Sequence, residues 1–370
     1  MFKKVVCFLF LFLLIPVFVQ AEVIEPEFEQ TQTFKAEVLE IIKEQVQERE
    51  NSSWSVKQLI RLRGLSDGWE DKEVVFDGTE HDVLSAAQYQ VGDKVIVNRS
   101  LGVDGEENFY IIDYARGRSL LWLLIIFSLL VILVGHWKGL RALVVLGLTF
   151  FIILKFIIPQ ILVGTNPVWV TIIGSVFILL FALYITEGFN KYSHIAIVSI
   201  LISLVITGLC SSWFTGLAKL SGFASDEVMF LLSSSYGFID VHGLLLAAII
   251  IGTLGVLDDL VISQVMTVKQ LKQASVNLNR LELYKRSMKV GVSHLSSMVN
   301  TLFLAYAGAA LPLLLLFGIK EPPFIKFSQI ISQEIIATEI VRTLAGSVGL
   351  ILAVPIATLL AVAFIKKSTN

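Results

Sequence analysis

Long runs of apolar residues fill most of the chain after Leu120 and constrain its fold more than any other feature. A helix needs about 20 mainly apolar residues to cross the hydrocarbon core of a bilayer, at ~1.5 Å per residue. We predict seven spanning helices, at approximately residues 119–135, 140–158, 168–186, 193–214, 243–264, 295–318 and 342–365. The predicted fold is an α-helical polytopic membrane protein with the lipid bilayer as its main partner.

The first 21 residues have the pattern of a secretory signal peptide. Lys3 and Lys4 precede an apolar run from Val5 to Val19, and small residues at Val19 and Ala21 suit cleavage after Ala21. The run is shorter than a spanning helix requires. The alternative is an uncleaved anchor, and in both cases the next segment is exported.

Residues 22–118 are predicted to form a small extracytoplasmic β domain. Short segments of apolar/polar alternation are separated by turn residues such as Asp77-Gly78 and Gly92-Asp93. The five predicted strands lie at 34–38, 56–62, 73–76, 94–97 and 109–112. This number and length of strands indicates an OB- or SH3-like barrel. The alternative for Lys35 to Glu50 is a helix, because Glu, Lys and Gln dominate its second half.

Charge is distributed unevenly along the chain, and this pattern predicts the topology. Residues 22–118 contain 21 acidic and 11 basic residues, a net charge of −10, whereas the remaining residues are net positive. Basic residues fall in alternate short loops, with the richest run between Lys269 and Lys289, and the chain ends near Lys366 and Lys367. The positive-inside rule then places the β domain outside and the C-terminus in the cytoplasm of a bacterial cell. Basic residues in short loops indicate topology rather than binding to nucleic acid.

Two adjacent carboxylates, Asp258 and Asp259, lie within the fifth apolar run. Charged groups in a spanning helix are costly and usually face protein or water. The functional interpretation is a polar seam that is accessible to ions or protons. The alternative is a structural pair in which at least one aspartate forms a salt bridge with Lys269 or Lys289. Small residues at 248, 252 and 255 share a face with Asp259 and favour close approach of another helix.

The sixth and seventh runs contribute further polar residues. Asn300 and Thr301 are predicted at the depth of the aspartates, either facing them in the seam or forming interhelical hydrogen bonds. Glu339 and Arg342 lie one helical turn apart and are predicted to form an interfacial ion pair. The fourth run carries Ser or Thr at positions 199, 203, 207 and 211, which indicates a packing face.

Several chemistries lack support in the sequence. The two cysteines, Cys7 and Cys210, provide no disulfide in the mature chain, and the five histidines are not clustered at metal-ligand spacings. We find no phosphate-binding loop and no arrangement of nucleophile and base. Adjacent aspartates on one helix point about 100° apart, which disfavours an aspartyl protease. We therefore predict no enzymatic activity, no metal and no cofactor.

Motifs in the second half of the chain are similar to those of the YibE/F family of bacterial membrane proteins. The motifs are Gly255-Val-Leu-Asp-Asp259, Leu283-Tyr-Lys-Arg-Ser-Met-Lys-Val-Gly291, Val299-Asn-Thr-Leu-Phe-Leu-Ala-Tyr-Ala-Gly308 and Glu339-Ile-Val-Arg342. The segments at 92–96 and 110–116 also fit the longer, YibE-type members, which have an N-terminal extracytoplasmic domain. The resemblance implies an integral membrane protein and no particular biochemical function.

Two functional hypotheses follow. The first is a transporter-like or proton-coupled membrane component in which Asp258 and Asp259 handle ions or protons. The second is a non-transporting subunit or envelope assembly factor whose external domain recruits a partner. A looser similarity to half of a resistance–nodulation–division permease implies that a transporter would need a second copy or a paired family member.

Overall fold

The computed structural model describes residues 32–48, 54–79, 88–101, 106–223, 226–233, 238–275, 277–319 and 325–364. The chain forms two compact units: one contains a β-sheet and extends to Val134, and the other contains the helices from Gly135 onward. The predicted signal peptide, residues 1–21, lies outside the described residues.

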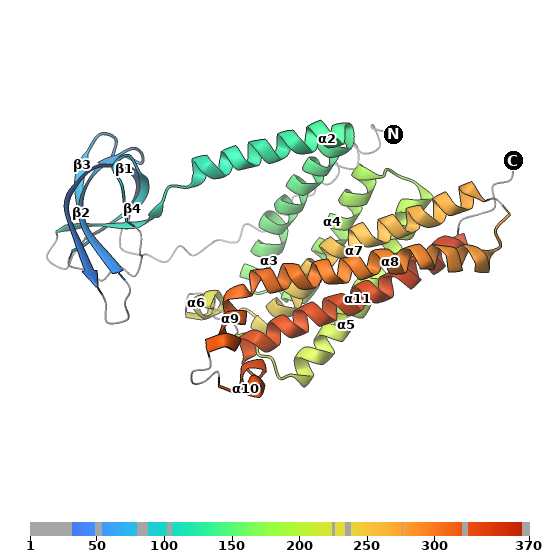
Figure 1. The fold of residues 1–370 in the computed structure, drawn as a ribbon. Helices are drawn as coiled ribbons and strands as arrows, with labels where there is room; N and C mark the ends of the chain where they lie inside the picture. Colours follow the sequence, from blue (N-terminus) through green and yellow to red (C-terminus); the bar gives the residue numbers. More distant parts are fainter. Residues whose placement is uncertain are drawn as a thin grey trace. The chain divides into compact units, whose positions relative to one another are not determined.

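Five strands form one antiparallel sheet in the order β3–β2–β1–β4–β5 (Figure 1). They are β1 (Gln32–Glu48), β2 (Trp54–Gly64), β3 (Glu73–Asp77), β4 (Lys94–Leu101) and β5 (Glu107–Tyr114). Each strand contains one of the five predicted segments. The long central strand β1 pairs with both β2 and β4, and its register against β2 shifts after Val38 and again after Ile41. Such irregularities bend a strand, and the sheet curls.

The helical alternative for Lys35 to Glu50 is wrong, because residues up to Glu48 belong to β1. Phe34, Ala36 and Val38 alternate into the core, whereas the charged residues between and after them point outward. Glu37 and Glu40 form ion pairs with arginines of β2, at 3.3 Å in each case. Cross-strand pairing and burial therefore outweigh the helix propensity of the segment.

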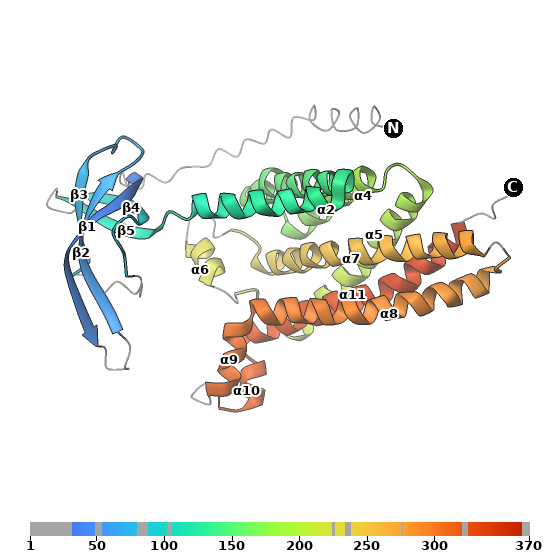
Figure 2. The ribbon, with the colours of Figure 1, turned by 45° about the horizontal axis from the view of Figure 1, so that its top comes forward.

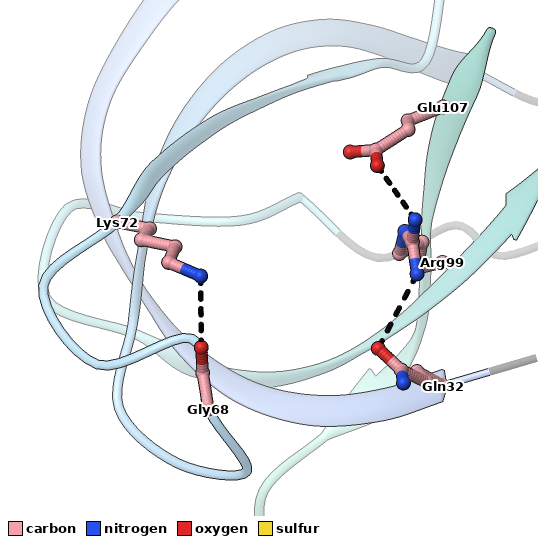
Figure 3. A network of polar contacts seen from close by, with 5 residues as sticks. All are labelled: Gln32, Gly68, Lys72, Arg99 and Glu107. Carbon is pink, nitrogen blue, oxygen red and sulfur yellow. Dashed lines mark hydrogen bonds and ion pairs between the residues drawn. The ribbon is translucent and has the colours of Figure 1, made fainter.

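An aromatic cluster lies in the core of the sheet unit. The Trp69 ring stacks on Phe34 with centroids 4.9 Å apart and meets Phe109 edge-on at 5.4 Å. Lys72 and Arg99 both lie over the Trp69 ring. Figure 3 shows their polar contacts: Lys72 donates to the Gly68 carbonyl, and Arg99 contacts Glu107 and Gln32. The structure thus shows a curled antiparallel sheet with an aromatic and aliphatic core, and the predicted OB- or SH3-like barrel is not confirmed.

The remaining elements are helical. They are α2 (Gly117–Ile152), the π-helical turn η1 (Ile153–Ile157), α3 (Ile158–Leu162), α4 (Pro167–Thr186), α5 (Lys191–Leu217), α6 (Asp226–Ser233), α7 (Val241–Ala274), α8 (Arg280–Ala309), α9 (Leu311–Ile319), α10 (Phe327–Ile331) and α11 (Glu334–Phe364). Asparagines cap three of them: Asn166, Asn190 and Asn279 accept hydrogen bonds from the first backbone N–H groups of α4, α5 and α8.

Within the described residues, five helical runs are long and apolar enough to cross a membrane. They are Gly117–Leu162, Pro167–Thr186, Lys191–Leu217, Val241–Ala274 and Glu334–Phe364. The predicted number of seven is not confirmed. The first two predicted spans lie in a single run of 46 residues, whose backbone leaves the helical conformation at His136 (φ 47°, ψ −129°). The sixth, 295–318, is divided between α8 and α9.

The predicted basic loop after the fifth span is largely helical. Helix α7 continues to Ala274 and includes Lys269 and Lys272, and α8 begins at Arg280. A capping box between Asn279 and Glu282 starts α8, since each side chain accepts from the other residue's backbone N–H. The connection between the two helices is therefore much shorter than hydropathy alone predicted.

Helices α5, α7, α8 and α11 pack together as the centre of the second unit (Figures 1 and 2). The buried face of α5 carries the predicted Ser/Thr stripe. Ser203 and Thr207 donate to backbone carbonyls four residues earlier, at 2.9 and 2.8 Å. A Cβ atom at Gly349 of α11 would lie 3.1 Å from the Thr207 Cβ. Small residues thus let α5 and α11 approach closely.

Candidate functional site

Asp258 and Asp259 lie in the middle of α7 in different surroundings. Asp258 is half-buried, and its Oδ1 atom is buried without a hydrogen-bond partner among the described residues. Asp259 is exposed. Since adjacent helical residues point about 100° apart, only one of the two can face the interior. The sequence predicts a pair, and the structure distinguishes an inner carboxylate from an outer one.

A third carboxylate, which the sequence analysis did not select, contributes to this region. Glu187 is the C-terminal cap residue of α4, and its negative charge acts on Asp258 together with that of Asp259. The cluster of like charges belongs to helices α4 and α7, which pack against each other. Glu187 follows an apolar run directly, so its position beside Asp258 depends on how α4 and α7 pack.

The predicted salt bridges to the aspartates are not seen. Within the described part of the chain, neither Asp258 nor Asp259 forms an ion pair with Lys269 or Lys289. The Lys269 ammonium instead lies 4.4 Å from the centroid of the Tyr192 ring on α5. This cation–π contact joins α7 to α5, and Asp258 has no cationic partner among the residues that the structure describes.

Asn300 and Thr301 lie at about the same level along α8 as the two aspartates do along α7. Tyr306 of α8 lies beside Gly252 of α7, and Ser287 of α8 accepts a hydrogen bond from Gln264 of α7. Asn300 and Thr301 fall between these two contacts on α8, as the aspartates do on α7.

The two residues do not bond to the aspartates, however. Thr301 donates to the Ser297 carbonyl of its own helix. Asn300 lines a groove of about 660 Å³ formed by α5, α8 and α11. Their predicted role in a seam with the aspartates therefore stays a prediction.

The small-residue face of α7 is only partly covered. A Cβ atom at Gly252 would lie 2.6 Å from the Tyr306 hydroxyl, whereas one at Gly255 would meet no atom of the described residues within 4 Å. Ala248 and Asp259, which share this face, are exposed. The face predicted to pack against α8 therefore remains largely open.

A second group of polar residues surrounds Arg342 of α11. Arg342 Nη1 forms an ion pair with Glu339 at 2.8 Å. Both residues line a cavity of about 640 Å³ between α6, α7, α8, α9 and α11. Tyr306 and Thr338 line it as well, and neither was selected from the sequence. No single sequence pattern links these residues, because the cavity is assembled from segments far apart in the chain.

The described residues contain no group of three or more His, Cys, Asp or Glu side chains that could hold a metal ion.

A comparison with known protein families identifies a relationship for the helical part of the chain. Residues 123–367 match the family described as YibE/F-like protein. The chain belongs to the YibE/F-like family. Comparisons with curated proteins and with solved structures found no significant match.

The matched part of this YibE/F-like protein contains every candidate residue named above. It includes Asp258 and Asp259, the Asn300-Thr301 pair, and Glu339 with Arg342. The five strands lie outside the match, since β5 ends at Tyr114. The family resemblance therefore concerns the helical unit, a membrane protein by the length and composition of its helices.

Proposed function

We propose that this YibE/F-like protein is a transporter-like or proton-coupled component of the bacterial cytoplasmic membrane, in which Asp258 and Asp259 exchange ions or protons. One observation carries the proposal: Asp258 has a buried carboxylate oxygen without a partner among the described residues, in the middle of an apolar helix. Ionisable residues in such helices commonly mark pathways for ions or protons. The negative charges of Asp259 and Glu187, which both act on Asp258, support a site that attracts cations.

The proposed topology has seven crossings, with the β-sheet outside and the C-terminus in the cytoplasm. The run Gly117–Leu162 would measure about 69 Å as a straight helix, about twice the thickness of the hydrocarbon core. The break at His136 supports dividing it into two crossings. Helices α8 and α9 supply the remaining one. A reporter fused after Lys285 is expected to lie in the cytoplasm, and an external reporter would refute the topology.

Proton movement tests the role of the aspartates. The purified protein is reconstituted into vesicles containing a pH-sensitive dye, and an imposed pH gradient is followed over time. We expect the wild type to dissipate the gradient and Asp258→Asn/Asp259→Asn to do so at least tenfold more slowly, which corresponds to a barrier that is higher by about 1.4 kcal/mol or more. Glu282→Gln is the matched control, because glutamine preserves the capping box. Equal rates for the wild type and the double variant would disprove the proposal.

Water access to Asp258 provides a test that does not depend on the coupling ion. In a background carrying Cys210→Ser and Cys7→Ser, a cysteine at position 258 is treated with a membrane-impermeant thiol reagent. A conduit predicts labelling of Asp258→Cys and no labelling of Leu257→Cys, whose position is fully buried. Absence of labelling at both positions would favour a packed seam.

The open face of α7 favours a second role as the subunit of a larger membrane complex. Gly255 has free space around it, and small residues promote close helix packing in membranes. The partner proposed from this observation is a second copy of the chain or a paired YibE/F-family protein. A Gly255→Cys variant without the native cysteines is expected to form a disulfide-linked dimer in membranes if the partner is a second copy. A monomer under oxidising conditions would exclude that partner at this face.

A further inference from the structure

The cavity beside Arg342 has the size and lining of a small-molecule site. Its volume of about 640 Å³ falls within the range of ~300–1,000 Å³ that is typical of such sites. Most of the wall is aliphatic and includes Leu245 of α7 and Leu313 of α9. The polar side chains are concentrated on α8 and α11, so the cavity has an apolar part and a polar part.

The walls of this cavity are held in place by specific bonds. Glu334 at the start of α11 accepts hydrogen bonds from the backbone N–H groups of Ser221 and Gly222, at 2.7 and 2.8 Å. Gly222 lines the cavity, and its backbone (φ +89°) passes so close to Val241 that a Cβ atom would lie 2.7 Å from the Val241 carbonyl oxygen. The connection after α5 is therefore fixed against the first turns of α7 and α11.

Three hydrogen-bond donors in the cavity wall lack acceptors among the described residues. Thr338 is only 3% exposed, and its hydroxyl has no partner. The Nε–H group of Arg342 is likewise buried and unpartnered. Tyr306 of α8 also lines the cavity; its hydroxyl is not among the fully buried atoms and has no hydrogen bond within the described part of the chain. Buried donors without acceptors are unfavourable, and a ligand with acceptor oxygens would satisfy those of Thr338 and Arg342.

The ion pair with Glu339 leaves one edge of the guanidinium unpaired among the described residues. Glu339 occupies Nη1, whereas the edge formed by Nε and Nη2 has no partner among the described residues. This edge of an arginine matches the two oxygens of a carboxylate. Glu227 of α6 also lines the cavity and has an interaction of its own. Arg342 can thus bind a second carboxylate without releasing Glu339.

We propose that this cavity binds a monocarboxylate with an apolar body, whose carboxylate contacts the free edge of Arg342 and the hydroxyls of Thr338 and Tyr306. The apolar body packs against the aliphatic side chains from α7 and α9. The proposal adds a ligand class to the proposed transporter function, but the binding itself does not depend on proton exchange at Asp258.

Binding of 4-phenylbutyrate tests the proposal, with 4-phenylbutylammonium as the cationic counterpart. The full-length protein in phosphatidylcholine nanodiscs is titrated with each probe by calorimetry. We expect the carboxylate to bind and the ammonium to bind at least tenfold more weakly. Equal binding of the two probes, or no binding of the carboxylate, would overturn the proposal. Loss of binding when the nanodiscs contain phosphatidylglycerol would also overturn it, because the site would then belong to a lipid headgroup.

Substitutions test which residues form the site and whether binding is independent of the two aspartates. Arg342→Gln is expected to weaken 4-phenylbutyrate binding at least tenfold, and Arg342→Lys nearly as much, since lysine lacks the planar edge. Thr338→Val and Tyr306→Phe keep the ion pair and are expected to weaken binding about threefold each.

Two further variants serve as controls. Arg286→Gln, which removes a cation outside the cavity, and Asp258→Asn/Asp259→Asn should both bind as the wild type does. If Arg342→Gln does not fold, undiminished binding in Thr338→Val and Tyr306→Phe would be enough to refute the site. Normal binding without proton movement would refute the proposed function and leave this inference standing.

Discussion

The sheet unit and the helical unit both bury apolar residues, but they differ in how many polar residues they bury. The core of the sheet is almost entirely apolar, and Gln58 is the single buried polar residue among its described residues. The described helices bury fifteen polar residues, mostly Ser and Thr, and expose Leu, Ile, Phe and Trp side chains along their surfaces. Water drives apolar groups inward in the sheet, whereas lipid places no such demand on the helices. The comparison indicates that the two units fold in different solvents.

The largest loss of stability is expected when a large side chain is removed from the apolar core of the sheet. Phe34 is 1% exposed and stacks on Trp69, so Phe34→Ala should lower the free energy of unfolding of the sheet by about 3–5 kcal/mol. Urea-dependent proteolysis of the full-length protein in detergent measures this change. Val75→Ala removes an exposed side chain of β3 and serves as the control. Similar urea midpoints for the two variants would contradict an apolar core centred on Phe34.

Gly349 of the helical unit is expected to contribute to stability because it lets two helices pack closely, not because it buries a large apolar side chain. Gly349→Ala places a Cβ atom 3.1 Å from the Thr207 Cβ and forces α5 and α11 apart. We expect a destabilisation of about 1–3 kcal/mol. The thermal unfolding temperature in detergent reports it, with Gly147→Ala as the control because nothing lies within 4 Å of that position. An unchanged unfolding temperature in Gly349→Ala would show that close approach at this point is dispensable.

The two buried glutamines allow the same substitution to be compared in both units. Gln58 is 3% exposed and exchanges hydrogen bonds with the backbone of Tyr89, and Gln264 is 2% exposed and donates to Ser287 and Thr358. We expect Gln58→Leu to cost about 1–3 kcal/mol, since it leaves backbone groups unpaired. Gln264→Leu should cost roughly 0.6–1.7 kcal/mol, as is typical of bonds between helices in membranes. Urea-dependent proteolysis for Gln58→Leu and thermal unfolding for Gln264→Leu measure the two costs, and a larger cost at Gln264 would reverse the comparison.

The smallest change in stability is expected when a surface ion pair of the sheet unit is removed. The hydrogen bond from Arg116 holds the pKa of the Asp113 carboxyl below its ordinary value of 3.8. A carboxyl with a lowered pKa stabilises the fold above that ordinary value, and the contribution disappears as the pH falls below about 4. Asp113→Asn should therefore behave as the wild type does at pH 3 and be slightly less stable at pH 7. Urea midpoints at the two pH values check this, and an equal difference at both would exclude the ionised pair.

Local patterns in the sequence determined the elements of both units. Apolar/polar alternation located all five strands, because side chains of a strand point to opposite faces in turn. Runs of apolar residues located α4, α5, α7 and α11, since a spanning helix satisfies its own backbone hydrogen bonds and needs only length and apolar side chains. The motifs around Asp258 and Asn300 were sufficient to recognise the family. These properties depend on neighbouring residues alone.

The tertiary structure determined where several of these elements begin and end and which side chains from different elements come together. The break at His136, the helical continuation of α7 past Lys269 and the start of α8 at Asn279 are set by backbone conformation and capping rather than by average hydropathy. The groove that receives Asn300 depends on the rotation of α8 about its axis. The cavity at Arg342 draws its walls from five separate helices. Hydropathy is a sum along the chain, whereas a site requires side chains from distant segments to converge, and only packing determines that convergence.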